Sequence, residues 1–176
     1  MEIIALVSEE EKLVAELELL DIRYLSRQTT YLPTSVRPPE KLLADLAQQP
    51  SARVRAAVIA VLLAHPEFAA NISAALQNLT PIQQTTLRFY YLAAVFLQRV
   101  FAAPLQSRLG ARWQWIPERF AEEFDLPNDL PPREKLSRLG REHQRLTHIV
   151  ANWSGTCENV ARRLLHQWEL EQQWGR

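Results

Sequence analysis

Cysteine and glycine are scarce in this sequence. Cys157 is the only cysteine, which excludes a disulfide scaffold because this thiol has no partner. Glycine occurs four times, whereas alanine, leucine, glutamate, glutamine and arginine are abundant. This composition favours helices over a β-sandwich. With 47% hydrophobic residues, the 176-residue chain is also too apolar to be disordered and is long enough for one domain with its own core.

Long hydrophobic runs are missing as well. The two longest, Ala56–Ala64 and Phe89–Leu97, have nine residues each, whereas a membrane span needs about 20. The N-terminus carries Glu2 and lacks the pattern of a signal peptide. Together with the single thiol, these features predict a cytoplasmic protein that does not bind a membrane.

The chain has no net charge, because 20 basic residues balance 20 acidic ones. It therefore lacks the overall positive field typical of nucleic-acid-binding proteins. The charge is nevertheless segregated, at −4 over residues 1–50, +5 over 51–115, −4 over 116–132 and +3 over 133–176. Ordinary solvated helix faces explain this pattern, and a basic surface for phosphates or for an acidic partner is the alternative.

Helix caps and apolar periodicity predict an all-α fold. Ser8 with Glu11 and Thr80 with Gln83 are capping boxes at two helix starts. We expect a compact bundle of about seven or eight helices around one buried central helix. The expected helices span 9–26, 39–49, 52–64, 67–78, 81–109 and 117–125, followed by one interrupted helix or two helices over 133–174. Helix 81–109 is expected to be the buried centre, because it is apolar on every side from 89 to 97.

The whole chain, 1–176, is expected to form a single domain. Residues 28–39 contain three prolines and predict a linker. Residues 1–27, which include the first helix, either pack on the body or serve as a docking arm for a partner. Residues 40–79 contain a helix, a tight turn and an apolar helix, which resembles one HEAT-like hairpin. Because solenoids need about three repeats, we expect this hairpin to lie inside the bundle.

The last third of the chain combines an apolar seam with arginine. Spacings of 3, 4, 3, 4 and 3 residues separate Leu136, Leu139, His143, Leu146, Val150 and Trp153. This seam predicts a helix that lies along another helix, in its own core or in a partner. A basic stripe runs beside the seam, and it suits RNA phosphates or an acidic partner helix. A solvated flank that pairs with Glu134 and Glu142 is the alternative. The residues expected to bind a partner are Arg138, Arg141, Arg145, Arg162, Arg163, Trp168 and Trp174.

Catalytic and metal-binding patterns are weak. No two of the four histidines are three or four residues apart, so we expect no metal site, and no cofactor motif occurs. Cys157 lacks a histidine at helical distance and predicts a buried structural thiol. The four glycines are too dispersed to cradle a phosphate group.

Two arginine–histidine pairs resemble the Arg-x(4–6)-His motif of helical RNases of the HEPN type. Four residues separate Arg138 from His143, and six separate Arg141 from His148. The resemblance implies an RNase or toxin that uses these four residues in catalysis. The family has Asn, Asp or His directly after the arginine, whereas this chain has Leu139 and Glu142 there.

Two apolar stretches, 52–66 and 91–99, are similar to uncharacterised helical proteins encoded beside minimal nucleotidyltransferases in bacterial cassettes. The resemblance covers about 24 residues and carries over no catalytic residue. It implies a partner or regulator in a toxin–antitoxin or defence system. We therefore predict a non-catalytic helical interaction or regulatory subunit with a protein partner. The alternatives are the HEPN-type RNase and a subunit that binds RNA or DNA, and the pattern leaves a homo-oligomer open.

Overall fold

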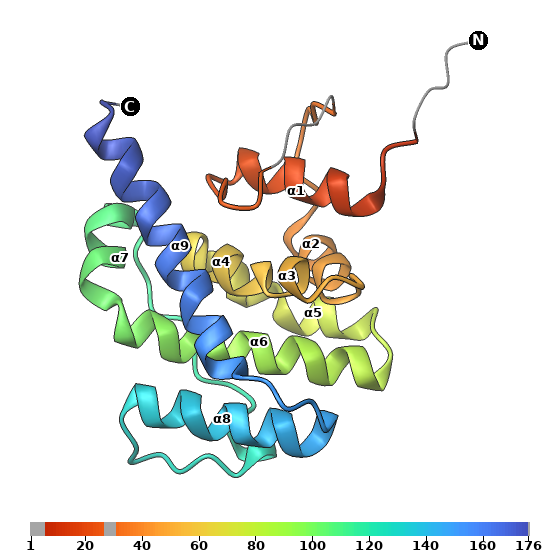
Figure 1. Cartoon of the computed structure of the whole chain (residues 1–176), viewed down its shortest axis with the longest axis vertical. Helices are drawn as coiled ribbons and strands as arrows, with labels where there is room; N and C mark the ends of the chain where they lie inside the picture. Colours follow the sequence, from red (N-terminus) through yellow and green to blue (C-terminus); the bar gives the residue numbers. More distant parts are fainter. Residues whose placement is uncertain (1–5, 27–30, 176) are drawn as a thin grey trace.

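The computed structural model describes residues 6–26 and 31–175, and the regular structure in these ranges is helical (Figure 1). Its α-helices are α1 (Glu9–Leu19), α2 (Pro39–Ala47), α3 (Ala52–Arg55), α4 (Ala57–Ala64), α5 (Ile72–Gln77), α6 (Pro81–Val100), α7 (Ala102–Leu109), α8 (Pro132–Thr147) and α9 (Trp153–Gln173). Short 3-10 helices are η1 (Pro66–Asn71), η2 (Gly110–Arg112) and η3 (Ala121–Phe124). Because only Ala56 separates α3 from α4, the described chain is a compact bundle of eight helices without strands, which confirms the all-α prediction.

The core is centred on α4 and α6. Every residue of α4 is buried, and α6 is buried without interruption from Phe89 to Gln98. α6 packs against α4 and α8, and it also contacts α2 and α9. In Figure 1, α6 accordingly lies between α8 and the α3–α4 layer, with α9 crossing in front. The predicted buried helix is confirmed over this part of its length.

The predicted central helix 81–109 is divided into α6 and α7 near Pro104, the proline that the sequence predicts to kink or break it. Phe101 leaves helical geometry, with φ −108° and ψ 28°, and separates α6 from α7. Pro104 explains this break, because its ring would collide with the carbonyl of Val100 in a continuous helix. Gly110, with φ 56°, ends α7 as predicted.

The first helix is also shorter than the predicted 9–26. α1 ends at Leu19, and Asp21 takes a left-handed conformation with φ 68°. The amides of Asp21 and Ile22 then donate to the carbonyls of Glu18 and Leu17, which is a Schellman cap. Because Asp occupies the position usually held by Gly, no glycine in the sequence marked this end.

The C-terminal segment forms two helices, which meet before Ser154-Gly155. α8 ends where His148 adopts a left-handed conformation with φ 58°, and Asn152 caps α9 by accepting a hydrogen bond from the Gly155 amide at 3.0 Å. The seam is therefore correct only for its first half. Leu136 and Leu139 are buried, whereas Val150 is 88% exposed beyond the helix end.

Other predicted helices differ in their bounds or in their type. The predicted helix 52–64 has a tight turn at Ala56, and 67–78 begins as η1 before α5. The predicted helix 117–125 is reduced to η3, and α2 ends two residues early. The predicted linker has no regular structure over 31–38, and its residues 28–30 lie outside the described ranges. α2 contacts α3 and α4, as in a helical hairpin.

In the described ranges, no single helix has both the length and the hydropathy to cross a membrane. One pair, Ala52–Ala64 with Pro66–Gln77, passes the test only when joined, and it is bent by 115°.

Candidate functional site

The basic stripe on α8 faces solvent. Arg138, Arg141 and Arg145 are exposed, because the opposite face of α8 carries Leu136 and Leu139 into the core. Arg145 pairs with Glu142 one turn back, at 2.8 Å. Within the described residues, Arg138 and Arg141 make no salt bridge. Two of these three arginines therefore have no salt-bridge partner among the described residues.

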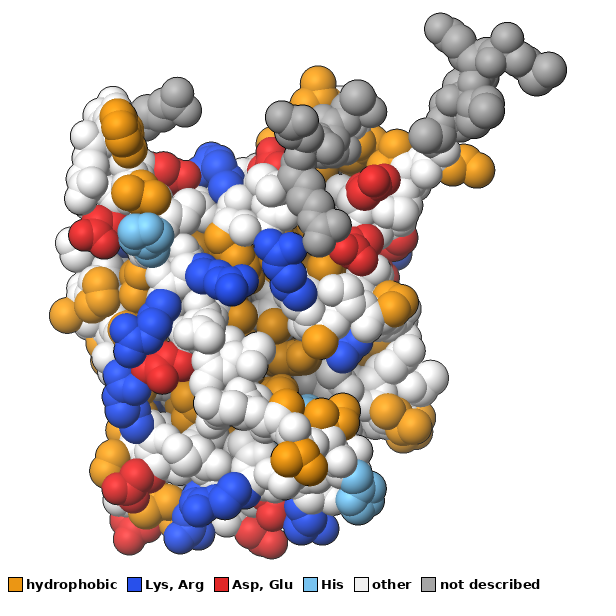
Figure 2. Space-filling model, in the orientation of Figure 1, with side chains coloured by type: hydrophobic (Ala, Val, Ile, Leu, Met, Phe, Trp, Pro, Cys, Tyr) orange, Lys and Arg blue, Asp and Glu red, His pale blue; other side chains and the backbone are white. Residues whose placement is uncertain are grey.

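Exposed apolar side chains lie at the end of α8 and just after it, close in the chain to these arginines. Leu146, Ile149 and Val150 are 45%, 56% and 88% exposed. We call residues 141–150 the α8–α9 corner. A hollow of about 470 Å³ in this corner is lined by Arg141, Gln144, Arg145, His148 and Val150. In Figure 2, cationic and hydrophobic side chains adjoin at the lower edge of the molecule, where α8 lies. The corner thus combines positive charge with apolar surface.

The structure separates one of the two arginine–histidine pairs. Arg138 lines a different hollow, of about 430 Å³, beside Asp125 and Glu142. His143 turns inward and stacks on Trp153, with ring centres 4.6 Å apart. Burial, and then the charge of Arg55, lower the pKa of His143. Arg141 and His148, in contrast, line the same hollow at the corner.

The residues expected on α9 have different surroundings. Arg162 pairs with Glu158 at 3.1 Å and lies 5.3 Å above the ring of Phe101. Arg163 is exposed and makes no salt bridge within the described residues. Trp174 is 79% exposed at the end of α9. Arg163 and Trp174 are therefore accessible, whereas the exposed Arg162 already interacts with Glu158 and Phe101 of its own chain.

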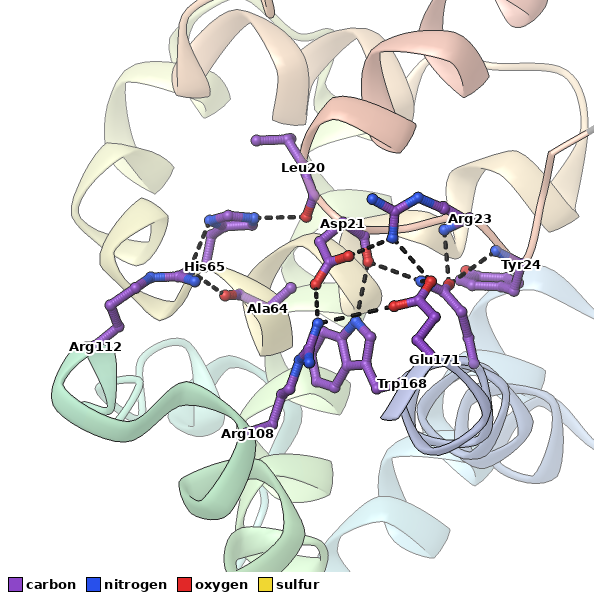
Figure 3. Close-up of polar contacts among 11 residues, drawn as sticks. Leu20, Asp21, Arg23, Tyr24, Ala64, His65, Arg108, Arg112, Trp168 and Glu171 are labelled. Carbon is purple, nitrogen blue, oxygen red and sulfur yellow. Dashed lines mark hydrogen bonds and ion pairs between the residues drawn. The ribbon is translucent and has the colours of Figure 1, made fainter. Parts of the chain in front are cut away.

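Trp168, expected to bind a partner, is instead packed inside its own chain. It is 3% exposed, and its Nε1 donates to the carbonyl of Asp21 at 3.0 Å (Figure 3). The carboxylate of Asp21 accepts from Arg108, whose guanidinium lies 5.2 Å from the Trp168 ring. Arg23 pairs with Glu171 at 2.8 Å. We call this cluster of Asp21, Arg23, Arg108, Trp168 and Glu171 the α1 junction. The ring of Trp168 is covered because the chain after α1 supplies both a carbonyl and a carboxylate.

Further contacts fix α1 on the body. Buried Glu16 pairs with Arg37 at 2.7 Å, and Arg37 also pairs with Asp45 at 2.6 Å. His65 contacts the carbonyl of Leu20 at 2.8 Å (Figure 3). Of the two alternatives for the first helix, the described part of it, 9–19, packs on its own body.

A second concave region escaped the sequence analysis. A cavity of about 480 Å³ lies between the α2–α3 turn, α6, the end of α8 and the start of α9. Arg55, Tyr90, His143 and Trp153 line it. Arg55 lies in the stretch 52–66 and Tyr90 in the apolar run 89–97, but no spacing in the sequence relates either to the seam residues His143 and Trp153.

Side chains that could bind a metal ion, and the Cys157 thiol, are candidate reactive groups among the described residues. Within residues 6–26 and 31–175, no group of three His, Cys, Asp or Glu side chains is placed to hold a metal ion. Burial raises the pKa of the Cys157 thiol, which disfavours the reactive thiolate.

Comparison with protein-family models, with curated proteins and with solved structures finds no match for this chain.

Proposed function

We propose that this chain is a non-catalytic interaction or regulatory subunit. Its α8–α9 corner binds a protein segment that carries both acidic and apolar side chains. A place in a bacterial toxin–antitoxin or defence system, implied by the sequence resemblance, belongs to the same proposal.

The composition of the corner supports this proposal. Its hollow is lined by Arg141 and Arg145 without any carboxylate, and Val150 lies beside them. Exposed apolar residues in one patch are typical of protein interfaces, and arginine is enriched there. A partner with carboxylates and apolar side chains would complement both properties.

The same corner suits nucleic acid less well. Proteins that bind single-stranded nucleic acid stack the bases on exposed aromatic rings. Among the described residues that line this hollow, His148 is the only one with an aromatic ring. The nearest tryptophan along the chain, Trp153, lines a different cavity and not this hollow. Contacts with phosphates would also leave the apolar side chains at this corner exposed to water.

The test begins with a tagged pulldown from the native host after RNase treatment. The stoichiometric partner is then purified and titrated calorimetrically against variants of this chain. Arg141→Glu with Arg145→Glu should weaken binding by about tenfold or more. Arg53→Glu with Arg119→Glu is the matched control, because it makes the same charge change at two exposed arginines elsewhere.

Equal binding by both double variants would overturn the assignment of this corner. Loss of every partner after RNase treatment would instead support the subunit that binds RNA, and its affinity should fall steeply with salt.

A second candidate is the HEPN-type RNase, because Arg141 and His148 line one hollow. In that case His148→Ala should abolish cleavage of single-stranded RNA. His166→Ala, an exposed histidine on α9, is the control. Absence of cleavage by the unmodified chain, or undiminished cleavage by His148→Ala, would eliminate this candidate.

A further inference from the structure

The 480 Å³ cavity between α2, α6, α8 and α9 has the dimensions of a small-molecule site. It is separate from the hollow at the corner, although both include residues at the end of α8. Its walls come from the α2–α3 turn, α6, the end of α8 and the start of α9, so the cavity forms only when these elements pack together.

One wall of the cavity is aromatic. Trp153 is stacked on His143, and the Tyr90 ring lies 5.8 Å from Trp153 at 34°. Phe89 supports both rings from behind, with edge contacts at 5.2 Å to His143 and 5.7 Å to Trp153. The rings are therefore fixed before any ligand arrives, which suits the binding of a flat molecule.

The charge of the cavity has one sign. Among the described residues, Arg55 is the only permanently charged one that lines it, and no described aspartate or glutamate does. Burial and the charge of Arg55 lower the pKa of His143, which favours its neutral form. A cationic ligand would meet Arg55 without any compensating carboxylate, whereas an anionic group would be attracted.

The fold also orients Arg55. Its Nη1 donates to the carbonyls of Gln49 and Pro50, both at 2.7 Å, at the turn between α2 and α3. The Arg55 side chain also interacts with the Tyr90 hydroxyl, which lines the same cavity. A guanidinium that two backbone carbonyls hold in a cavity wall is oriented before a ligand arrives, and arginine binds carboxylates and phosphates through paired hydrogen bonds.

We propose that this cavity binds a small planar aromatic molecule that carries one anionic group, a carboxylate or a phosphate. The ring of the ligand packs against the Tyr90–Trp153 wall, and its anionic group meets Arg55. The inference does not depend on the function proposed for the corner.

Calorimetry and saturation-transfer NMR on the full chain test this with matched probes. Indole-3-acetate, indole-3-acetamide and tryptamine represent the carboxylate, the neutral analogue and the cation. Adenosine monophosphate and adenosine represent the phosphate and its neutral analogue. We expect at least one anion to bind about ten- to a hundredfold more tightly than its neutral analogue, since hydrogen bonds to charged groups are the stronger ones. The tighter anion identifies the group that Arg55 prefers.

Neighbouring threonines on α6 provide a matched pair of variants. Thr86 lines the cavity, whereas Thr85 does not, and both donate to the carbonyl four residues earlier. Thr86→Trp should fill the cavity and weaken binding by about tenfold or more, and Thr85→Trp should bind as the unmodified chain does. Thr147→Trp fills the cavity from the opposite side, in case Thr86→Trp does not fold.

Arg55→Gln should bring the affinities of the anion and the neutral analogue close together. The proposal is overturned if no anion binds, if the neutral analogues bind as tightly, or if the filling variants retain binding.

Discussion

The α1 junction and the α8–α9 corner both place arginines beside apolar side chains, but only the junction supplies enough carboxylates. At the junction, Arg108 and Arg23 meet Asp21 and Glu171, and the tryptophan beneath them is covered. At the corner, Arg141 has no carboxylate partner and Val150 is 88% exposed. The same residue types therefore close one surface and leave the other open.

Acidic residues explain this difference. The N-terminal 50 residues carry a net charge of −4, and α1 brings them onto a body whose residues 51–115 carry +5. Residues 133–176 carry +3, and their arginines on α8 lie away from α1 (Figure 1). Their charge is therefore only partly balanced within the chain, which is why the corner is the better surface for an acidic partner.

The two C-terminal tryptophans should show the largest contrast in stability. Trp168→Ala removes a ring that is 3% exposed and should lower the free energy of unfolding by about 3–5 kcal/mol. Trp174→Ala removes a ring that is 79% exposed and should change it by less than about 0.5 kcal/mol. Urea unfolding followed by circular dichroism measures both. Equal effects would contradict the burial of Trp168 against the junction.

Glu16 tests the ion pairs that hold α1. Its side chain is 8% exposed and accepts from Arg37 through both oxygens, so Glu16→Gln leaves a poorly solvated guanidinium with less compensation. We expect a loss of about 2 kcal/mol in the free energy of unfolding. Glu18→Gln on the same helix is the control, since Glu18 makes no salt bridge within the described residues. If the two variants unfold at the same urea concentration, this cluster contributes nothing to stability.

Asp21 should make the junction sensitive to pH. Burial opposes ionisation of its carboxyl, but hydrogen bonds and charge from Arg108 and Arg23 outweigh burial and lower its pKa. The unfolded chain then binds more protons, so this stabilisation is present above the ordinary pKa near 4 and disappears as the pH falls through the lowered value. Asp21→Asn should cost about 1 kcal/mol at pH 7, a modest value because the carboxylate is partly solvated.

The cost of Asp21→Asn should shrink between pH 4 and pH 2 (urea unfolding across this range). Asparagine tolerates the left-handed conformation of this position, so the substitution isolates the charge. Asp129→Asn, at an exposed residue, should show no such trend. A cost of Asp21→Asn that is the same at every pH would contradict the role of the ionised carboxylate.

The fold was more predictable than the site because it depends on repeated local signals. Both capping boxes and the nine-residue apolar runs identified α1, α4 and α6. The ends of α1 and α8 were missed because Asp21 and His148, rather than glycine, adopt the left-handed conformation.

Tertiary contacts decided the rest. The burial of Trp168 depends on a carbonyl 147 residues away, and the cavity joins Arg55 to His143 across the bundle. No spacing in the sequence encodes either contact, since each depends on how α1, α3 and α8 dock onto the core.

The corner should show the smallest effect on stability. Arg141→Gln with Val150→Gln removes an unpaired charge and an exposed apolar side chain, so the free energy of unfolding should change by less than about 0.5 kcal/mol. Arg108→Gln at the junction is the contrasting variant, because it breaks a salt bridge and uncovers Trp168, and it should be less stable than the corner variant. A corner variant that unfolds as readily as Arg108→Gln would mean that this surface contributes to the fold. Unchanged unfolding together with lost partner binding would show that the chain keeps these residues for an interface.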